Sequence, residues 1–419
     1  MGEIIRSVDD SGRTVALKKI LKEYQGEEQF RELFKQEAEI IFQLDHPNIV
    51  RAYNFQRVGQ QLVLAMEYLE GVNLRDILVK AQEKHFQIPL GVVLKIMKGL
   101  LEGLDYAHSK RDDVTGDHLE FVHRDINPSN VFVTFLGETK ILDFGISKMC
   151  SKGGGAFIEK TPTGKIRGKV AYLAPEQIRE SEMDHRVDIF ACGVLLWELL
   201  TNETLFYRDS QQMTLDAILD GNYPDILSAR DDLPPAISQV MRKALCLKPN
   251  GRFKSCKEFA KALQVALDQR VIPDALDEDV STFVRVLFQK NADTKEPGFL
   301  SGHAYLLTQI PGLEKAGIDL AETLAHEHPD LPIVQLNFAR SLFSVGRKSE
   351  GLRVLGSLSQ FSILDEVAHQ LWVWLGVRRP VVVPFLSRRN AVNRSLGIIR
   401  HRILGPTDRY KTLELELAA

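Results

Sequence analysis

The sequence is poor in cysteine: it has four in 419 residues, and no two of them stand at the C-x-x-C spacing of zinc and redox sites. This scarcity excludes a disulfide scaffold and favours a reducing compartment. The longest apolar run, at about residues 189–200, is shorter than the roughly 20 residues that a membrane span needs. The first residues are charged instead of apolar, which argues against a signal peptide. The sequence therefore predicts a soluble, cytoplasmic protein without a membrane span.

The chain also lacks an excess of charge of either sign, since 53 Lys and Arg residues oppose 56 Asp and Glu residues. A net charge of −3 creates no overall field that would draw the molecule to nucleic acid or to an anionic membrane. The hydrophobic content of 44% can fill real cores, which excludes disorder for most of the chain. At about 150 residues for each domain, the length predicts two to three domains.

The spacing of apolar residues indicates where strands give way to helices. The first seventy residues alternate like strands around one helix, with a strand expected near residues 13–20 and a strand pair near residues 60–71. Apolar residues recur at helical spacing over residues 27–44, and Glu37 falls inside that apolar stripe. A carboxylate placed there is buried and needs a partner. From residue 74 to about 267, helical patterns dominate.

Five short motifs follow one another in the sequence. They are VALK at Val15–Lys18, HPNIV at His46–Val50, HRDINPSN at His123–Asn130, DFG at Asp143–Gly145 and APE at Ala174–Glu176. A single three-letter match would be weak, but five matches in one order and at ordinary intervals are specific. Over about residues 2–267, the sequence resembles the bacterial branch of the eukaryotic-like (Hanks-type) serine/threonine protein kinases.

The resemblance implies an α+β fold, a two-lobed protein kinase fold with a truncated first strand in the N-lobe, and it implies ATP and Mg²⁺ between the lobes. Lys18 would reach the α- and β-phosphates, and an ion pair with Glu37 would fix it. Asp125 would accept the proton of the substrate hydroxyl. Oxygen atoms of Asn130 and Asp143 would hold Mg²⁺, which prefers hard oxygen ligands.

The same resemblance implies the contacts of the adenine ring. Ala16 lies two residues before Lys18 on the predicted strand, so both side chains share a face, and the small alanine would lie flat against adenine. Met66 would line the back of the adenine pocket. Glu67 and Leu69 would offer backbone groups to the adenine edge.

Other residues resemble structural positions of the family. Glu176 and Arg252 would form a buried ion pair below the substrate site, and Asp188 would anchor the catalytic loop through backbone hydrogen bonds. Removing one partner of such a pair typically costs about 3–5 kcal/mol. His123 and Phe144 are expected to pack in the core and to take no part in the chemistry.

The sequence departs from the family pattern at its beginning. Gly2 takes the place of the third glycine in the Gly-rich loop, and Ile4 takes the place of the apolar residue over adenine. The first two glycines and the first strand have no sequence to occupy, so we expect the natural protein to begin upstream. The chain as given is expected to bind Mg-ATP weakly and to transfer phosphate slowly, because loop amides would be missing over the phosphates.

Two further departures lie close to the reacting groups. Asn127 stands where the serine/threonine kinases usually carry a lysine, two residues after Asp125. Lys169 replaces the usual threonine in the segment GKVAYLAPE. One hypothesis is that the Lys169 ammonium replaces the one that is missing at position 127.

The segment between DFG and APE carries candidate modification sites. In the family, an arginine at the position of Arg124 pairs with a phosphate on this segment and orders it. Thr161 and Thr163 lie in the segment, and we expect autophosphorylation at one or both, with Thr163 favoured. The alternative is that both are solvated loop residues.

The region after the kinase-like part indicates two weak helix-turn-helix units. Gly317, Pro329, Ala339 and Gly346 fall at places of the tetratricopeptide repeat, which has a period of about 34 residues, although Gly351 stands where alanine is usual. Fewer than three repeats seldom stand alone. Binding of a protein partner and plain helical packing therefore both remain open.

The last part of the chain is basic, with nine Arg and Lys residues against Asp408 between residues 378 and 411. Such an excess could bind nucleic acid or anionic lipid. Apolar residues are interleaved with the basic ones, which favours an amphipathic segment docked on the protein itself and makes nucleic-acid binding the weaker alternative.

These patterns lead to one domain plan and two functions. We expect a kinase domain at 1–267 (N-lobe 1–66, hinge 67–71, C-lobe 72–267), a linker at 268–297, a helical tetratricopeptide-like region at 298–376 and a basic tail at 377–419. The favoured function is ATP-dependent transfer of the γ-phosphate to Ser or Thr hydroxyls of protein substrates. The segment YLAPEQ lacks the tryptophan that tyrosine kinases tend to show there, which favours Ser and Thr over Tyr as acceptors. The alternative is a pseudokinase scaffold that binds partners through its helical C-terminus.

Overall fold

The computed structural model describes residues 2–59, 61–112, 114–144, 169–231, 233–267, 277–288, 296–310 and 312–358. These residues form two units, one that ends at residue 288 and one that begins at residue 296. The basic tail expected at 377–419 and the candidate phosphorylation sites Thr161 and Thr163 lie outside the described residues.

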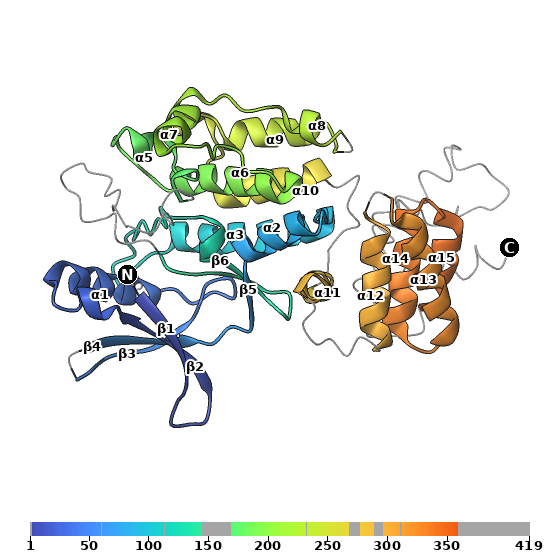
Figure 1. The fold of residues 1–419 in the computed structure, drawn as a ribbon, viewed down its shortest axis with the longest axis horizontal. Helices are drawn as coiled ribbons and strands as arrows, with labels where there is room; N and C mark the ends of the chain where they lie inside the picture. Colours follow the sequence, from blue (N-terminus) through green and yellow to red (C-terminus); the bar gives the residue numbers. More distant parts are fainter. Residues whose placement is uncertain are drawn as a thin grey trace, which may run out of the picture. The chain divides into compact units, whose positions relative to one another are not determined.

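The small lobe of the first unit is an antiparallel sheet with one helix against it (Figure 1). Its elements are β1 (Gly2–Val8), β2 (Thr14–Ile20), η1 (Lys22–Tyr24), α1 (Glu28–Ile41), β3 (Ala52–Val58) and β4 (Gln61–Glu67). The strand order is β1-β2-β4-β3. The strand predicted near residues 13–20 and the helix predicted over 27–44 are confirmed as β2 and α1.

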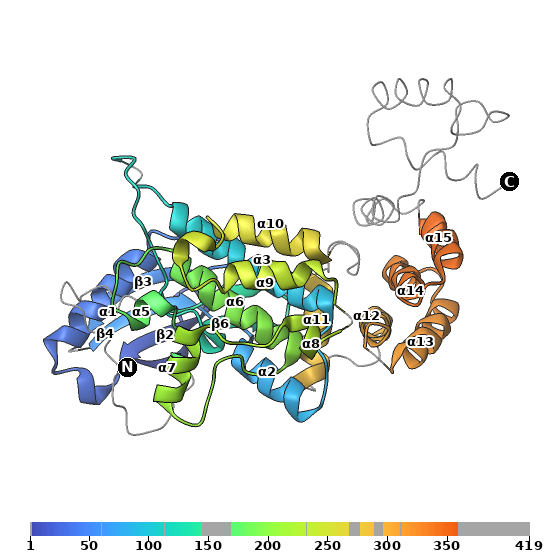
Figure 2. The ribbon, with the colours of Figure 1, turned by 90° about the horizontal axis from the view of Figure 1, so that it is seen from above.

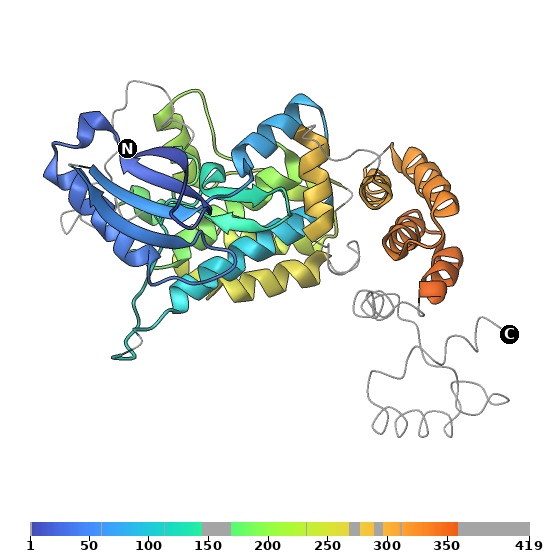
Figure 3. The ribbon, with the colours of Figure 1, turned by 90° about the horizontal axis from the view of Figure 1, so that it is seen from below.

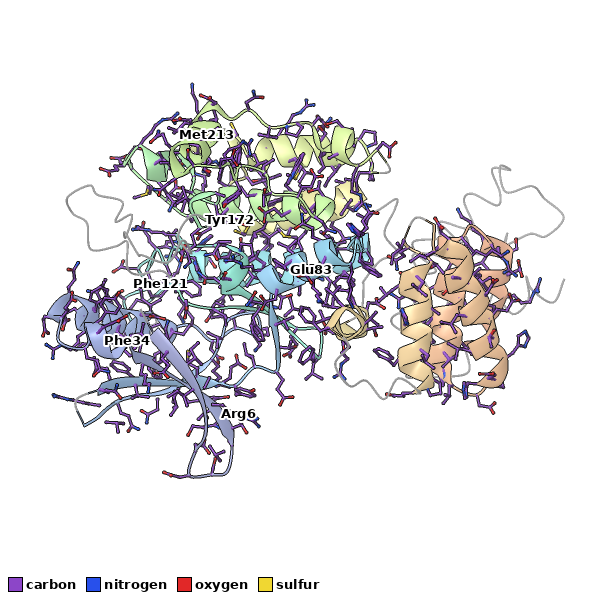
Figure 4. All side chains as sticks on the ribbon, in the orientation of Figure 1. Arg6, Phe34, Glu83, Phe121, Tyr172 and Met213 are labelled. Carbon is purple, nitrogen blue, oxygen red and sulfur yellow. The ribbon has the colours of Figure 1, made fainter. Side chains whose placement is uncertain are left out.

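Helix α1 presents its apolar stripe to the sheet. Phe34, labelled in Figure 4, is buried, and its ring centroid lies 5.7 Å from that of Phe55 in β3. Ala38 and Ile41 on the same helix are buried as well. Because Glu37 shares this side of the helix, the packing that buries the stripe also turns its carboxylate toward β2.

The large lobe is mainly helical and contains a second, small sheet of order β5-β6-β7. Its elements are β5 (Gly71–Asn73), α2 (Leu74–Glu83), α3 (Leu90–Ser109), η2 (Pro128–Asn130), β6 (Val131–Thr134), β7 (Thr139–Ile141), α5 (Pro175–Ile178), α6 (Arg186–Thr201), α7 (Gln211–Asp220), α8 (Ile226–Ala229), α9 (Ala236–Ala244), η4 (Pro249–Gly251) and α10 (Cys256–Leu267). The expected α+β, two-lobed architecture is thereby confirmed.

Helix α6 forms the interior of the large lobe. Every residue from Val187 to Leu200 is buried, because apolar residues occupy every side of the helix and only Asp188 and Glu198 interrupt them. Helices α3 and α9 pack against it, and α10 packs against both of these (Figure 2). This packing gives the large lobe a well-packed interior that can hold the site residues in fixed positions.

The segment expected to be a linker contains α11 (Asp277–Phe288), which packs on the large lobe against α2 and α3 (Figure 3). Val280, Phe283, Val284 and Leu287 are all buried there. Ser281 Oγ and Arg285 Nε donate to the carbonyl oxygen of Phe135, at 2.6 and 3.0 Å. These contacts make α11 part of the first unit.

A glycine in the turn between β6 and β7 permits this docking. Gly137 has a φ of 92°, and a Cβ added to it would lie 1.8 Å from the carbonyl oxygen of Asp277. Any other residue would therefore push the beginning of α11 away from the turn.

In its described residues, 296–310 and 312–358, the second unit has four helices that pack on one another. They are α12 (Pro297–Leu307), α13 (Glu314–Glu327), α14 (Pro332–Ser344) and α15 (Lys348–Ser357). Ala304, Ala321, Leu324 and Val334 form its core. A buried hydrogen bond of 3.0 Å from Asn337 Nδ2 to Ser301 Oγ connects α14 with α12. Within the described ranges, no helix has both the length and the apolar composition to cross a membrane.

The docking of α11 leads to a test of stability. Phe283 is 1% exposed, so Phe283→Ala should leave a cavity and lower the free energy of unfolding by about 3–5 kcal/mol. As a control, Val265→Ala removes methyl groups from α10 at a position that is 65% exposed. This variant should change the free energy of unfolding by less than about 0.5 kcal/mol. Urea unfolding of the full chain measures both variants. Equal small losses would show that α11 is not part of the folded unit.

Candidate active site

One ammonium group connects the two lobes of the first unit. Lys18 Nζ of β2 lies 2.5 Å from Glu37 Oε1 of α1 and 2.6 Å from Asp143 Oδ1, which follows β7. The Lys18 side chain is 11% exposed, whereas Asp143 keeps 44% of its side-chain surface accessible. The structure therefore brings together three predicted site residues from three separate parts of the chain.

The electrostatics of this cluster distinguish its two carboxyl groups. Partial desolvation would raise the pKa of Asp143, but the Lys18 ammonium, helped by His123 and Lys169, holds that pKa below its usual value. For Glu37, burial dominates and raises its pKa, the charge of Asp143 adds to this, and Lys18 opposes it. Asp143 is thus the carboxylate that stays ionised and accessible, while Glu37 holds the lysine in place.

The loop of the HRD motif is anchored to α6 by hydrogen bonds. Asp188 in the first turn of α6 accepts hydrogen bonds from the backbone N–H groups of His123 and Arg124, at 2.9 and 2.8 Å. The ring of His108 donates to the same carboxylate at 2.8 Å. Arg124 has a φ of 63°, a conformation that these bonds stabilise. The expectation that His123 and Phe144 pack in the core is confirmed, since both are buried and their rings lie 4.9 Å apart.

Two side chains hydrogen-bond the Asp125 carboxylate among the residues that the structure describes. Asn130 Nδ2 lies 3.1 Å from Asp125 Oδ2 and also donates to the Asp125 carbonyl oxygen at 2.8 Å. Lys169 Nζ lies 3.1 Å from the same Oδ2 atom. The Lys169 side chain is 50% exposed and that of Asp125 is 24% exposed, so both remain accessible to a substrate.

Asn127 has a local structural task in this loop. Its Oδ1 accepts a hydrogen bond of 3.0 Å from the backbone N–H of Ser129 and so caps the turn η2. Its Nδ2 donates to the Asp125 carbonyl oxygen at 2.8 Å. The side chain is 2% exposed and contributes no charge to the site.

The residues expected around adenine lie on the strands of the small lobe and at the beginning of the hinge. Ala16 pairs with Met66 across β2 and β4, and both are buried. Gly2 lies beside the Lys18 side chain, whereas Ile4 is 60% exposed. Leu69 follows in the hinge expected at residues 67–71.

The hinge is attached to the large lobe by a contact that the sequence patterns did not single out. Glu67 Oε1 accepts from the backbone N–H of Arg51 at 2.8 Å and from Lys140 Nζ at 3.0 Å. Lys140 lies in β7, and a lysine between Thr139 and Ile141 in a short strand was the available signal. A second missed contact runs from Gln177 Nε2 to the Arg124 carbonyl oxygen, at 3.0 Å, and no sequence pattern points to it.

Below the HRD loop, Glu176 and Arg252 form a buried, bidentate ion pair with distances of 2.6 and 2.8 Å. Arg252 also donates to the carbonyl oxygens of Cys246 and Arg186. Because Nε, Nη1 and Nη2 of this guanidinium group each donate to an acceptor, the pair can remain charged in the interior.

The donor atoms suit a hard divalent cation. Within the described part of the chain, no group of three or more His, Cys, Asp or Glu side chains is placed to enclose a metal. Asp143 offers an accessible carboxylate, and Asn130 donates through Nδ2 to Asp125 and so turns its Oδ1 away from that residue. Two oxygen ligands with further positions left to phosphate and water are what Mg²⁺ prefers.

Comparison with known proteins gives consistent matches. A family model described as the protein kinase domain matches residues 1–265. The chain is 37% identical over 263 residues to the tyrosine-protein kinase MasK of Myxococcus xanthus, which covers 63% of this chain and 40% of that protein. It is 31% identical over 262 residues to the serine/threonine-protein kinase PknL of Mycobacterium tuberculosis, which covers 62% of this chain and 61% of that protein.

Among solved structures, the crystal structure of the Mycobacterium tuberculosis PknI kinase domain matches at 26% identity with a TM-score of 0.47. The match covers 64% of this chain and 91% of that one. The chain spans 40% to 61% of the lengths of MasK and PknL.

The buried ion pair below the loop leads to a second stability test. Arg252→Met should lower the free energy of unfolding by about 3–5 kcal/mol, because it leaves the Glu176 carboxylate buried without a counter-charge. Arg242→Met is the matched control, since Arg242 pairs with Asp225 but is 69% exposed, and should cost less than about 1 kcal/mol. Equilibrium unfolding of the full chain compares the two, and equal losses would mean that burial does not set the strength of these pairs.

Proposed function

The chain belongs to the protein kinase family, and we propose that it transfers the γ-phosphoryl group of ATP to serine or threonine hydroxyls of protein substrates. One observation carries this proposal. The Lys18 ammonium is held between Glu37 and Asp143, and the residue before Asp143, Leu142, donates its backbone N–H at 2.9 Å to the carbonyl oxygen of Asn130, the partner of Asp125. A cation, a metal-binding carboxylate and a proton acceptor are the parts that phosphoryl transfer requires.

ATP would bind between the lobes. Lys18 would contact the α- and β-phosphates, and Ala16 and Met66 would enclose adenine, supported by their pairing across β2 and β4. The backbone at Glu67 and Leu69 would bind the adenine edge. The Glu67 carboxylate is occupied by Arg51 N–H and Lys140, which fixes the hinge backbone in position.

Gly2 and Ile4 complete the proposed nucleotide site from the strand β1. Gly2 lies beside the Lys18 side chain, so the backbone there can approach the phosphates closely. The exposed Ile4 side chain is available to cover adenine.

The metal would be held by Asn130 and Asp143. When bound, Mg²⁺ would neutralise charge on the phosphate oxygens. The Lys18 ammonium supports the site by keeping the Asp143 carboxylate ionised, and Asp125 keeps the Asn130 amide oriented.

Asp125 would orient the acceptor hydroxyl and take its proton. The acceptor oxygen then forms a bond to the γ-phosphorus while the bond to the β,γ-bridging oxygen breaks, and ADP leaves. Asp188 supports this step at a distance, since its carboxylate holds the backbone on which Asp125 stands.

Specificity for serine and threonine rests on a sequence argument and on relatives with differing names. The segment YLAPEQ lacks the tryptophan that tyrosine kinases tend to show at this place. PknL is named a serine/threonine-protein kinase, whereas MasK is named a tyrosine-protein kinase. We favour serine and threonine, and analysis of the phosphorylated amino acids decides the question.

The helical unit is proposed to bind a protein partner as a tetratricopeptide-like pair of repeats. Gly317 and Gly351 lie 34 residues apart. A Cβ on Gly317 would lie 2.6 Å from the Thr308 nitrogen, and one on Gly351 would lie 2.4 Å from the Phe343 ring. Both glycines thus allow the second helix of each pair to approach the first. Plain helical packing is the alternative.

We propose the cytoplasm as the location and a kinase domain that includes α11 beyond residue 267. The three cysteines within the described ranges, Cys192, Cys246 and Cys256, are free thiols, which suits a reducing compartment. The competing function is a pseudokinase scaffold, which would use the helical unit and perform no transfer.

Activity separates the enzyme from the scaffold. With radiolabelled ATP and Mg²⁺, the full chain should label itself or myelin basic protein on serine or threonine, and Asp125→Asn should lower the rate by at least about 100-fold. Asp220→Asn is the control, because Asp220 is an exposed aspartate at the end of α7. Equal labelling by Asp125→Asn and the unaltered chain would contradict the enzyme, and phosphotyrosine would contradict the specificity.

The segment before APE should become phosphorylated. We expect mass spectrometry of the active chain to find phosphate on Thr161 or Thr163, with Thr163 favoured, because Arg124 at the HRD motif could pair with it. Replacing both threonines with alanine should lower activity several-fold. Finding both threonines unmodified in active protein would contradict this.

A further inference from the structure

The positive charge beside Asp125 comes from a distant part of the chain, at the position of Lys169 that the sequence hypothesis names. Lys169 lies 44 residues after Asp125, yet its ammonium lies 3.1 Å from Asp125 Oδ2. At this distance the ion pair is direct, and it leaves the other carboxylate oxygen of Asp125 for an acceptor hydroxyl.

Phosphoryl transfer needs positive charge where negative charge gathers on the transferring group. Lys18 is already shared by Glu37 and Asp143. Asn127, in the loop itself, is neutral and both ends of its amide are used by backbone groups. Among the described side chains that bond the Asp125 carboxylate, Lys169 is the one that carries a positive charge.

The backbone that carries Lys169 is held against the large lobe. Three residues further on, Tyr172, labelled in Figure 4, donates its hydroxyl hydrogen to Glu198 Oε2 at 2.6 Å. Gln177 then bonds the carbonyl oxygen of Arg124, beside Asp125. The backbone is thereby fixed, while the half-exposed Lys169 side chain can still turn toward a bound phosphate.

The charge of Lys169 also reaches the proposed metal ligand. It is one of the groups that hold the pKa of Asp143 below its usual value, after the larger effects of desolvation, which acts in the opposite direction, and of Lys18. Lys169 thus acts electrostatically on both carboxylates of the proposed reaction, Asp125 and Asp143.

We propose that Lys169 is a catalytic residue, whose ammonium contacts the γ-phosphoryl group and neutralises its charge during transfer. This inference rests on the proposed kinase function. Lys169 neither gains nor loses a proton: the acceptor hydroxyl gives its proton to Asp125, its oxygen bonds the γ-phosphorus, and ADP departs with the electrons of the broken bond. The positive charge that acts on the γ-phosphoryl group therefore comes from position 169 and not from the HRD loop.

The test compares charge at position 169 with charge elsewhere. Lys169→Met should lower kcat by about 100-fold with myelin basic protein as acceptor, and should leave the KM for ATP within about threefold. Lys169→Arg should retain at least about a tenth of kcat, since the charge is kept. Lys80→Met is the matched control, because Lys80 also contacts a carboxylate, Glu83, and is 39% exposed. It should leave kcat unchanged.

A second variant moves the charge. Asn127→Lys in the Lys169→Met background should raise kcat at least about tenfold above that of Lys169→Met alone, because a lysine at position 127 would carry its charge on the same loop as Asp125. Thermal unfolding of every variant shows whether it is folded, and the half-exposed position of Lys169 predicts no change of melting temperature for Lys169→Met.

The outcomes distinguish this inference from the proposed function. If Lys169→Met is as active as the unaltered chain while Asp125→Asn is inactive, the role of Lys169 is wrong and the kinase function stands. A higher KM for the acceptor with unchanged kcat would mean that the ion pair only positions the segment, and this would also overturn the proposal. Equal loss in Lys169→Met and Lys169→Arg would contradict a role for charge. An unaltered chain without any labelling would overturn both.

Discussion

The arrangement of the site depends on one buried carboxylate, Asp188. It stands in the first turn of α6, the helix whose residues 187–200 are all buried, and it accepts the N–H groups of His123 and Arg124. Burial would raise the pKa of Asp188, but the hydrogen bond and charge of His108, with His123, keep that pKa below its usual value. Hydrogen bonds to a charged group are worth about 1.5–3 kcal/mol each, enough to hold the loop in a backbone conformation that it would otherwise avoid.

From this anchored loop, the site extends to the small lobe through shared charges. Lys18 joins Glu37 and Asp143 with one ammonium, and Lys140 joins the hinge residue Glu67 to β7. The Lys18–Asp143 and Lys140–Glu67 contacts each link a strand of the small lobe to β7 or to the residues that follow it. The position of α1 is therefore coupled to the ionisation and placement of Asp143, because both carboxylates compete for the same ammonium.

The fold was predicted best where the sequence has strong periodicity. Helix α1 and strand β2 lie where the apolar spacing expected them, and the motifs indicated that Lys18, Glu37 and Asp143 belong together. The acidic, proline-containing stretch near α11 predicted a linker, because composition alone does not show that Phe283 has a surface to cover. In the helical unit, Gly317 and Gly351 fit a repeat, yet spacing alone does not distinguish a repeat from ordinary helical packing.

The sequence by itself determined the protein class, the two-lobed α+β plan and the chemical type of each candidate group, because these depend on residue identity, local periodicity and motif order. Tertiary structure decided the contacts that the motifs left unspecified. The contacts Lys169–Asp125, Lys140–Glu67 and Gln177–Arg124 join residues 44 to 73 positions apart. The free energy of such contacts depends on the packing of whole helices and strands, so no local pattern along the chain encodes them.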